Sequence, residues 1–367
     1  MAALITRCLN LVESIDPEQV PETVFEFLLS LSGPTVIKIK GQRDGHDAGC
    51  RIITTLLHAN EPSGFRVLHK FLKEGFEPLF DTYFILASIR AAKQEPVFSH
   101  RFLPGERDLN RCFSPPYTDT NGQLAKAIID FIVEHKPECV IDLHNTSGSG
   151  PIFSVSTRHQ CQHIGLGSFF SRWLVHAEIP LGAIMELPLT CPIITVEAGG
   201  AQDKDADFNA YIGLRRLLLS EEPFDMQQPV DVLHRPIRLE VNTESSLAYS
   251  DRPVFGVNIT LCQDIERFNF GLTPIGERVG WADIDGLKHF NLNGQQLGVN
   301  VVDYFNIDSG ELRTTQPLKI FMATSCLDIA KSDCILYFVA ADTHVHHPTQ
   351  RDQVDDDNSL PMVTTND

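Results

Sequence analysis

Short runs of apolar and β-branched residues alternate with amphipathic segments up to about residue 220. The apolar runs are typical of buried strands and predict strands at 34–39, 51–57, 81–89, 138–144, 151–156 and 193–197. Apolar residues at helical spacing predict helices within 1–32 and at 62–72, 121–135, 163–175 and 207–220. This alternation predicts an α/β fold with a mixed, largely parallel sheet flanked by helices.

The pattern changes after the Glu-Glu-Pro sequence that ends at Pro223. Short apolar runs at 254–259, 298–302 and 334–339 are separated by Gly, Asn and Asp, which predicts a mainly β region. A chain of 367 residues is also longer than one hydrophobic core usually supports. We therefore expect a first domain at 1–225, a smaller β-rich C-terminal domain at 226–345, and an acidic, disordered tail at 346–367.

The composition of the chain bears on its possible binding partners and on its cellular location. The formal net charge of -18 disfavours binding to nucleic acid or to an anionic membrane. Nine cysteines, odd in number and never spaced as Cys-x-x-Cys, indicate reduced thiols rather than a disulfide framework. The opening residues do not read as a signal peptide, and no apolar run approaches the roughly 20 residues of a membrane span. We expect a cytoplasmic protein.

Three residues near predicted strand ends form a candidate metal site. His58 and Glu61 follow the strand that begins at Arg51, and His144 ends the strand at 138–144. A lone His at a strand end is more often a hydrogen-bonded surface residue. Strand ends of an open α/β sheet, however, meet at one edge, where two imidazoles and a carboxylate would suit a single Zn²⁺ ion with a fourth position open to water.

Further candidates would complete a hydrolytic site. Glu197 ends an apolar strand and is followed by glycines, which makes it a candidate base for activating water. In the long irregular stretch 90–119, Asn110 and Arg111 are candidates to hold a substrate carboxylate. Arg101 or Arg107 in the same stretch could reach the scissile carbonyl.

Asn145, in the turn after His144, is a further candidate for binding substrate. The alternative for any one arginine is a solvated loop charge. Three arginines within eleven residues of an acidic protein favour a binding role.

Four motifs occur together in one order: His58-Ala-Asn-Glu61, Asp108-Leu-Asn-Arg111, Asp142-Leu-His-Asn-Thr146 and Val196-Glu197-Ala-Gly199. In these motifs, over roughly residues 35–220, the chain resembles the succinylglutamate desuccinylase/aspartoacylase family, relatives of the zinc carboxypeptidases. The resemblance implies a zinc carboxypeptidase-like catalytic domain, one zinc ion per chain, and hydrolysis of an N-acyl amino acid.

The resemblance also implies a role for each matching residue. His58, Glu61 and His144 would bind zinc, and Glu197 would take a proton from the attacking water and pass it to the leaving amine. Asn110 and Arg111 would hold a substrate carboxylate. Arg101 would polarise the carbonyl, with Arg107 as the second choice.

Two positions depart from the family pattern. Ala59 replaces the usual Gly after the first ligand. The segment 180–195 contains no Lys or Arg, whereas aspartoacylases carry a substrate-binding arginine shortly before the catalytic Glu. A second substrate carboxylate would therefore lack support, which argues against N-acetylaspartate.

Two alternatives stay open at this point. A metallocarboxypeptidase would use the same ligands and base on peptides, and a non-catalytic relative would bind metal without turnover. The sequence also leaves the oligomeric state open, a homo-oligomer included.

Overall fold

A ten-stranded mixed sheet organises the structure. The computed structural model describes residue 5 and residues 8–43, 49–146, 148–178, 180–294, 298–332 and 334–349. The strands of the large sheet, in spatial order, are β1 (Asn10–Val12), β2 (Thr35–Ile39), β4 (Asp81–Leu86), β3 (Cys50–Thr55), β5 (Cys139–Thr146), β8 (Ile193–Gly200), β6 (Phe153–Ser156), β7 (Trp173–His176), β9 (Val230–His234) and β20 (His344–His347). Because β4, β3, β5 and β8 are parallel, their carboxyl ends share one edge.

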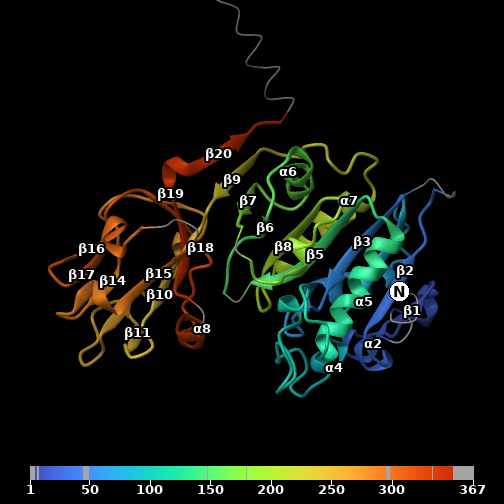
Figure 1. Ribbon diagram of the computed structural model, residues 1–367, viewed down its shortest axis with the longest axis horizontal. Helices are drawn as coiled ribbons and strands as arrows, with labels where there is room; N and C mark the ends of the chain where they lie inside the picture. Colours follow the sequence, from blue (N-terminus) through green and yellow to red (C-terminus); the bar gives the residue numbers. More distant parts are fainter. Residues whose placement is uncertain are drawn as a thin grey trace, which may run out of the picture.

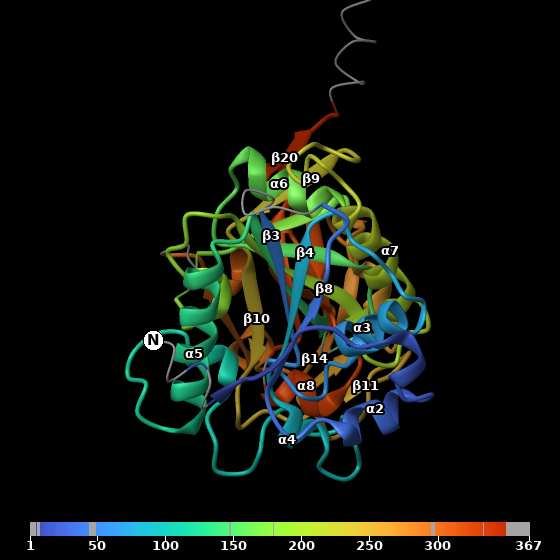
Figure 2. The same cartoon turned by 90° about the vertical axis from the view of Figure 1, so that its right-hand side faces the viewer.

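Helices cover both faces of this sheet (Figure 2). One face packs against α2 (Val24–Ser30), α3 (Ser63–Lys73), α6 (Cys161–Ser168) and α7 (Ala206–Leu218), and the other packs against α5 (Thr120–His135). Successive strand residues pack into hydrophobic cores on opposite faces of the sheet. Ile53 packs on the α3 and α7 face, and Ile52 packs on the α5 face. Burial on both faces explains why these strands are continuous apolar runs. The predicted mixed α/β architecture is confirmed.

Two five-stranded sheets follow in the sequence. One contains β13 (Leu272–Thr273), β18 (Leu318–Phe321), β19 (Leu336–Ala340), β10 (Ile237–Val241) and β15 (Phe290–Gly294). The other contains β11 (Leu247–Tyr249), β12 (Ile259–Leu261), β14 (Arg278–Ala282), β17 (Glu311–Thr314) and β16 (Phe305–Asp308). Residues of both sheets share one hydrophobic core. Figure 1 shows this part of the chain, coloured gold to red, as a lobe beside the β6 and β7 side of the large sheet.

Short helices connect these elements. Two are α-helical, α4 (Ile89–Ala92) and α8 (Leu327–Ser332). The 3-10 helices are η1 (Pro17–Gln19), η2 (Leu109–Arg111), η3 (Ile184–Glu186), η4 (Ile265–Phe268), η5 (Gly286–His289), η6 (Val301–Asp303) and η7 (Ala341–Thr343). The stretch 90–119 is otherwise irregular, as predicted.

Several element predictions were wrong. The helix expected at 163–175 ends at Ser168, and β7 follows, because Trp173 to His176 pairs with strands on both sides. Within 1–32 the structure has β1 as well as helix. The run 254–259 is not extended before Ile259, where β12 begins, because Gly256 has a φ of 84° and interrupts the extended backbone. The run 298–302 is not a strand, because η6 begins at Val301.

Strand pairing links the end of the chain to the first sheet. β9 and β20 fall within or beside the range expected for the second domain, yet they extend the large sheet beyond β7. The disordered tail was predicted to begin at residue 346, but His346 and His347 belong to β20 because they pair with β9. From residue 350 onward the predicted tail lies outside the described residues. None of the nine cysteines, all of which the structure describes, is in a disulfide bond, as expected. Among the helices that the structure describes, none combines the length and apolar character needed to cross a membrane.

Candidate metal centre and catalytic pocket

The candidate metal ligands meet at the carboxyl edge of the parallel strands. His58 and Glu61 lie on the turn between β3 and α3, and His144 lies in β5. Glu197 in β8 is the direct cross-strand partner of His144. Parallel pairing of β3, β5 and β8 therefore brings together four residues that span about 140 positions of the chain.

The donor atoms have the spacing of a single-ion site. Nδ1 of His58 lies 2.9 Å from Oε1 of Glu61, and Nδ1 of His144 lies 2.6 Å from Oε2. The two Nδ1 atoms are 3.1 Å apart. Ligands on a tetrahedral zinc ion with bonds of about 2.0–2.1 Å lie roughly 3.3 Å from one another. The two ring nitrogens and the two carboxylate oxygens therefore lie slightly closer together than the ligands of a bound zinc ion, and a small widening would admit one ion.

Carboxylates behind the rings favour the metal-binding tautomer. Nε2 of His144 lies 2.7 Å from Oδ2 of Asp142, and Nε2 of His58 lies 3.1 Å from Oδ1 of Asp108. When each Nε2–H donates to its carboxylate, each Nδ1 presents a lone pair to the centre. Nη2 of Arg101 also lies 2.6 Å from Nε2 of His58. Because a guanidinium only donates, this contact competes with the contact to Asp108, and it is the Asp108 contact that leaves Nδ1 of His58 to a cation. Three converging acceptors, all buried, make a donor set that fits a divalent cation.

The charges of the site reinforce this fit. Burial opposes ionisation of Glu61, but the charges of His58 and His144 hold its pKa well below its ordinary value. His144 is buried as well, yet Asp142 and Glu61 raise its pKa well above its ordinary value. The carboxylates of Asp142 and Glu61 therefore stabilise a positive charge at the site, which either a proton on His144 or a bound metal ion can supply.

Glu197 has the protonation behaviour of a general base and acid. Burial raises the pKa of Glu197 to about 7, against the opposing effect of the nearby His144. A carboxyl group with a pKa near neutrality can both accept and return a proton at physiological pH. Glu197 lines the same cavity as the candidate metal ligands.

Most of the predicted substrate-binding residues also line this cavity, which has a volume of about 220 Å³. They are Arg101, Asn110, Arg111 and Asn145. Arg101 donates from Nε to Asp108 over 3.0 Å and lies 3.5 Å from Glu61. Arg111 makes no salt bridge to a residue that the structure describes, so its charge is available to a substrate carboxylate.

Two predicted residues are placed differently. Arg107 is absent from the cavity lining; it forms a salt bridge with Asp119 and donates to the carbonyl of Pro116. Asn145 reaches the cavity, but its side-chain amide donates to Ser63 and Gly199. Asn145 was expected in a turn but lies within β5, and these bonds tie the end of β5 to the start of α3 and to β8.

The sequence analysis missed the contribution of the C-terminal strands. Arg238 in β10 and Tyr337 in β19 line the cavity, together with Phe321 and Met322 at the end of β18. Arg238 pairs with Glu240 on the same strand. It occupies an ordinary outward position in the alternating run Ile237–Val241, so no local signal marks it as a site residue.

No family model matches this chain, and no curated protein matches it by sequence. Solved structures, however, share its fold. A Shewanella frigidimarina protein described as a succinylglutamate desuccinylase/aspartoacylase superposes with a TM-score of 0.56 at 12% identity, covering 86% of this chain and 93% of its own. Succinylglutamate desuccinylase from Vibrio cholerae gives 0.53 at 16% identity, covering 89% and 99%. Murine aminoacylase 3 gives 0.51 at 14% identity, covering 83% and 99%. The chain therefore has the fold of these acylases and desuccinylases.

Proposed function

We propose that this protein is a zinc-dependent amidohydrolase that cleaves the amide bond of an N-acyl amino acid or a similar small amide. The proposal depends on one observation: the ligand atoms of His58, Glu61 and His144 lie within 4.8 Å of one another, beside Glu197 and in a cavity lined by three arginines. On this proposal the chain belongs to the succinylglutamate desuccinylase/aspartoacylase family, and residues 1–225 form a zinc carboxypeptidase-like catalytic domain. The shared fold with enzymes of that name supports the assignment.

Each side chain has a defined task in this proposal. His58, Glu61 and His144 would hold one zinc ion, which lowers the pKa of water and polarises a carbonyl when bound. Glu197 takes a proton from water and delivers it to the leaving amine. A bound cation would lower the pKa of Glu197 below the value set by burial, which favours the base form.

Positive side chains orient the substrate. Arg101 is held by Asp108 next to the metal ligands, where a guanidinium can donate to the oxyanion that develops on the carbonyl. Arg111, with Asn110 beside it, binds the carboxylate of the amino acid through parallel hydrogen bonds. Arg238, which pairs with Glu240, reaches the cavity from the C-terminal strands. A second acidic group of the substrate would lie nearer to this arginine than to any charge in the segment 180–195, which contains no Lys or Arg.

The cavity favours small substrates. Its volume of about 220 Å³ is below the ~300–1,000 Å³ of typical sites for drug-sized ligands. Tyr337 and Phe321 from the region 226–345 contribute to its wall. We propose that this region narrows the cleft, which favours an acyl amino acid over a peptide. A small-molecule substrate, with neither nucleic acid nor membrane as partner, also suits the expected cytoplasmic location.

A substrate panel tests the proposal. Zinc-loaded protein is assayed for release of free amino acid from N-acetyl and N-succinyl amino acids, with short peptides in parallel. We expect hydrolysis of one or more N-acyl amino acids and little cleavage of peptides. Cleavage of peptides alone would assign the protein as a carboxypeptidase.

Substitution of the base separates chemistry from metal binding. Glu197→Gln should retain zinc and lose activity by about 10²–10⁴-fold, the usual contribution of a general base. The exposed Glu77→Gln serves as control and should keep both properties. Full activity in Glu197→Gln would show that the assigned mechanism is wrong.

A further inference from the structure

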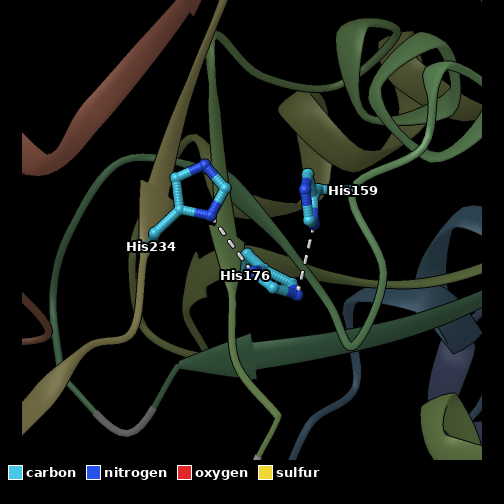
Figure 3. Close-up of side chains that lie close together, drawn as sticks. All are labelled: His159, His176 and His234. Carbon is cyan, nitrogen blue, oxygen red and sulfur yellow. Dashed lines mark hydrogen bonds between the residues drawn. The ribbon is translucent and has the colours of Figure 1, made fainter. Parts of the chain in front are cut away.

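A second cluster of histidines lies at other strand ends of the large sheet. His159 follows β6, His176 ends β7 and His234 ends β9 (Figure 3). β6, β7 and β9 are parallel to one another, so their carboxyl ends lie together. Because β6 runs antiparallel to β8, this edge is opposite the one that carries Glu197. The cluster is therefore separate from the proposed catalytic centre.

The three imidazoles are close enough to share one ion. Nδ1 of His176 lies 3.1 Å from Nδ1 of His234, and Nε2 of His176 lies 3.4 Å from Nδ1 of His159. One nitrogen from each ring can be chosen so that all three lie within 4.8 Å of one another. Ligands of a tetrahedral site lie roughly 3.3 Å apart. His159 is exposed, so its side chain can adjust more freely than those of the other two histidines.

The backbone holds the other two ligands in place. His176 and His234 are directly paired in the β7–β9 register, and His176 is also paired with Ser156 of β6. His176 is buried and His234 is half-buried. A site with two fixed ligands and one adjustable ligand loses little conformational freedom on binding an ion.

A carboxylate and a second charged side chain lie beside the three rings. A lone hydrogen-bonded chain of imidazoles is the alternative explanation for these contacts. A nitrogen of His159 and a nitrogen of His234 each lie within 3.4 Å of a ring nitrogen of the buried His176, and a neutral imidazole nitrogen in such a position can offer its lone pair to a cation. Glu178 lies 3.4 Å from His176 as the nearby carboxylate, and Arg235 and His347 are the other charged or titratable neighbours.

We propose that His159, His176 and His234 bind a second divalent transition-metal ion. Imidazole ligands favour zinc, copper or nickel over magnesium or calcium. Glu178 or water would complete the coordination, because Glu178 lines the same solvent-open cavity as the three histidines. Such an ion would link the loop after β6 to β7 and β9.

Metal stoichiometry tests this proposal with Zn²⁺ alone as the probe. Full-length protein is equilibrated with Zn²⁺ by dialysis, and bound metal is measured by mass spectrometry. We expect two equivalents in the wild type and one in the double variant His159→Gln, His234→Gln. The control His135→Gln changes a histidine at the end of α5 that bonds to the Phe131 carbonyl, and it should keep two.

The single variant His159→Gln keeps the test valid if the double variant does not fold. Its exposed side chain is not needed for packing, and it should weaken the second equivalent at least about tenfold, the effect of losing even an outer-shell partner. Equal stoichiometry and affinity in wild type and variant would overturn the proposal.

The test of the second metal site is independent of the test of the proposed catalytic centre. Glu61→Gln should remove the equivalent assigned to the catalytic centre and leave the one at His159, His176 and His234. Hydrolysis by the His159 and His234 variants should match the wild type, since these residues lie outside the catalytic cavity. If neither the wild type nor any variant hydrolysed a substrate, the proposed enzymatic function would be rejected. The number of zinc ions bound per chain would still decide whether the second metal site exists.

Discussion

Individual side chains at the proposed catalytic centre are oriented by partners that do not touch the metal position. Asp142 accepts from Thr54 over 2.7 Å and lies 2.7 Å from Nε2 of His144. Asp108 lies within hydrogen-bonding distance of both His58 and Arg101. The second and third sequence motifs thus contain the orienting acids as well as the functional residues, which explains why Asp precedes each of them.

Arg111 is expected to dominate recognition of the substrate carboxylate. Arg111→Met should raise KM about 10–100-fold with a smaller effect on kcat, because a hydrogen bond to a charged group contributes about 1.5–3 kcal/mol. Steady-state kinetics on the best N-acyl substrate measures this. Arg107→Met is the matched control from the same loop, since its guanidinium pairs with Asp119 outside the cavity. A larger effect from Arg107 would reverse the two assignments.

His163 in α6 should make stability depend on pH. Burial, with a smaller effect from Arg158 and His159, lowers its pKa to about 4, and its Nδ1 has no described hydrogen-bond partner. The unfolded chain, with an ordinary pKa of about 6.5, binds the proton first. The contribution of the neutral His163 to the free energy of unfolding is therefore complete above pH 6.5. It decreases as the pH falls from 6.5 toward 4.

Thermal unfolding of His163→Leu checks this dependence. Between pH 6.5 and 4, the melting temperature of the wild type should fall more steeply than that of the variant, in which no imidazole titrates at this position. Parallel curves would show that His163 takes up its proton equally in the folded and unfolded states.

At the scale of elements, the turn between β3 and α3 is held by close packing of the helix start. Gly64 leaves no space for a side chain: an added Cβ would lie 2.3 Å from Oγ1 of Thr55 and 3.1 Å from Cδ2 of Leu143. α3 therefore approaches β3 and β5 closely enough to place Glu61 against His144. The glycine is required by this contact rather than by its backbone torsions.

Gly64→Ala should accordingly damage both stability and metal binding. Overpacking of this kind costs about 1–3 kcal/mol, and displacement of α3 moves Glu61, three residues earlier, so zinc affinity should fall as well. Denaturant unfolding and zinc titration measure the two effects. Gly271→Ala is the control, because its Cβ would meet only the Phe268 carbonyl oxygen at 3.8 Å. Equal behaviour of the two variants would contradict the packing argument.

At the scale of the whole molecule, bound metal should contribute to global stability. The ligands of the proposed centre link β5 to the turn after β3, in the middle of the large sheet. An ion at about 1,000 times its Kd adds roughly 4 kcal/mol to the free energy of unfolding, which for a chain of this size is about 5 °C in Tm. Removal of zinc by a chelator should lower Tm by that amount.

Calorimetry with and without chelator measures this shift. Glu61→Gln, which lacks one proposed ligand, should respond much less than the wild type. The His159 and His234 double variant should retain most of the response. An unchanged Tm in chelated wild-type protein would argue against a structural contribution from the metal.

Two parts of the molecule approach each other around the cavity. Phe153 and Val175 of the large sheet share a hydrophobic cluster with Phe321 and Val339 of the C-terminal strands. Arg238 enters the cavity from the same side. The size of the cavity and its third arginine therefore depend on how the C-terminal strands pack against β6 and β7.

The sequence by itself determined the elements that carry the proposed centre. Buried strands of β-branched and apolar residues end at or beside His144 and Glu197, and parallel strands share a carboxyl edge. These local properties were sufficient to predict that His58, Glu61, His144 and Glu197 come together. The four motifs also predicted the fold that the solved structures share.

Only the tertiary structure decided which distant residues became neighbours. β7 was missed, so the pairing of His176 with His234, 58 residues later, had no basis in the sequence pattern. Arg238 reads as an outward strand residue, and only packing between sheets turns it toward the cavity. Local preferences specify where strands form, whereas burial of their remaining surfaces selects the register and partner of each strand.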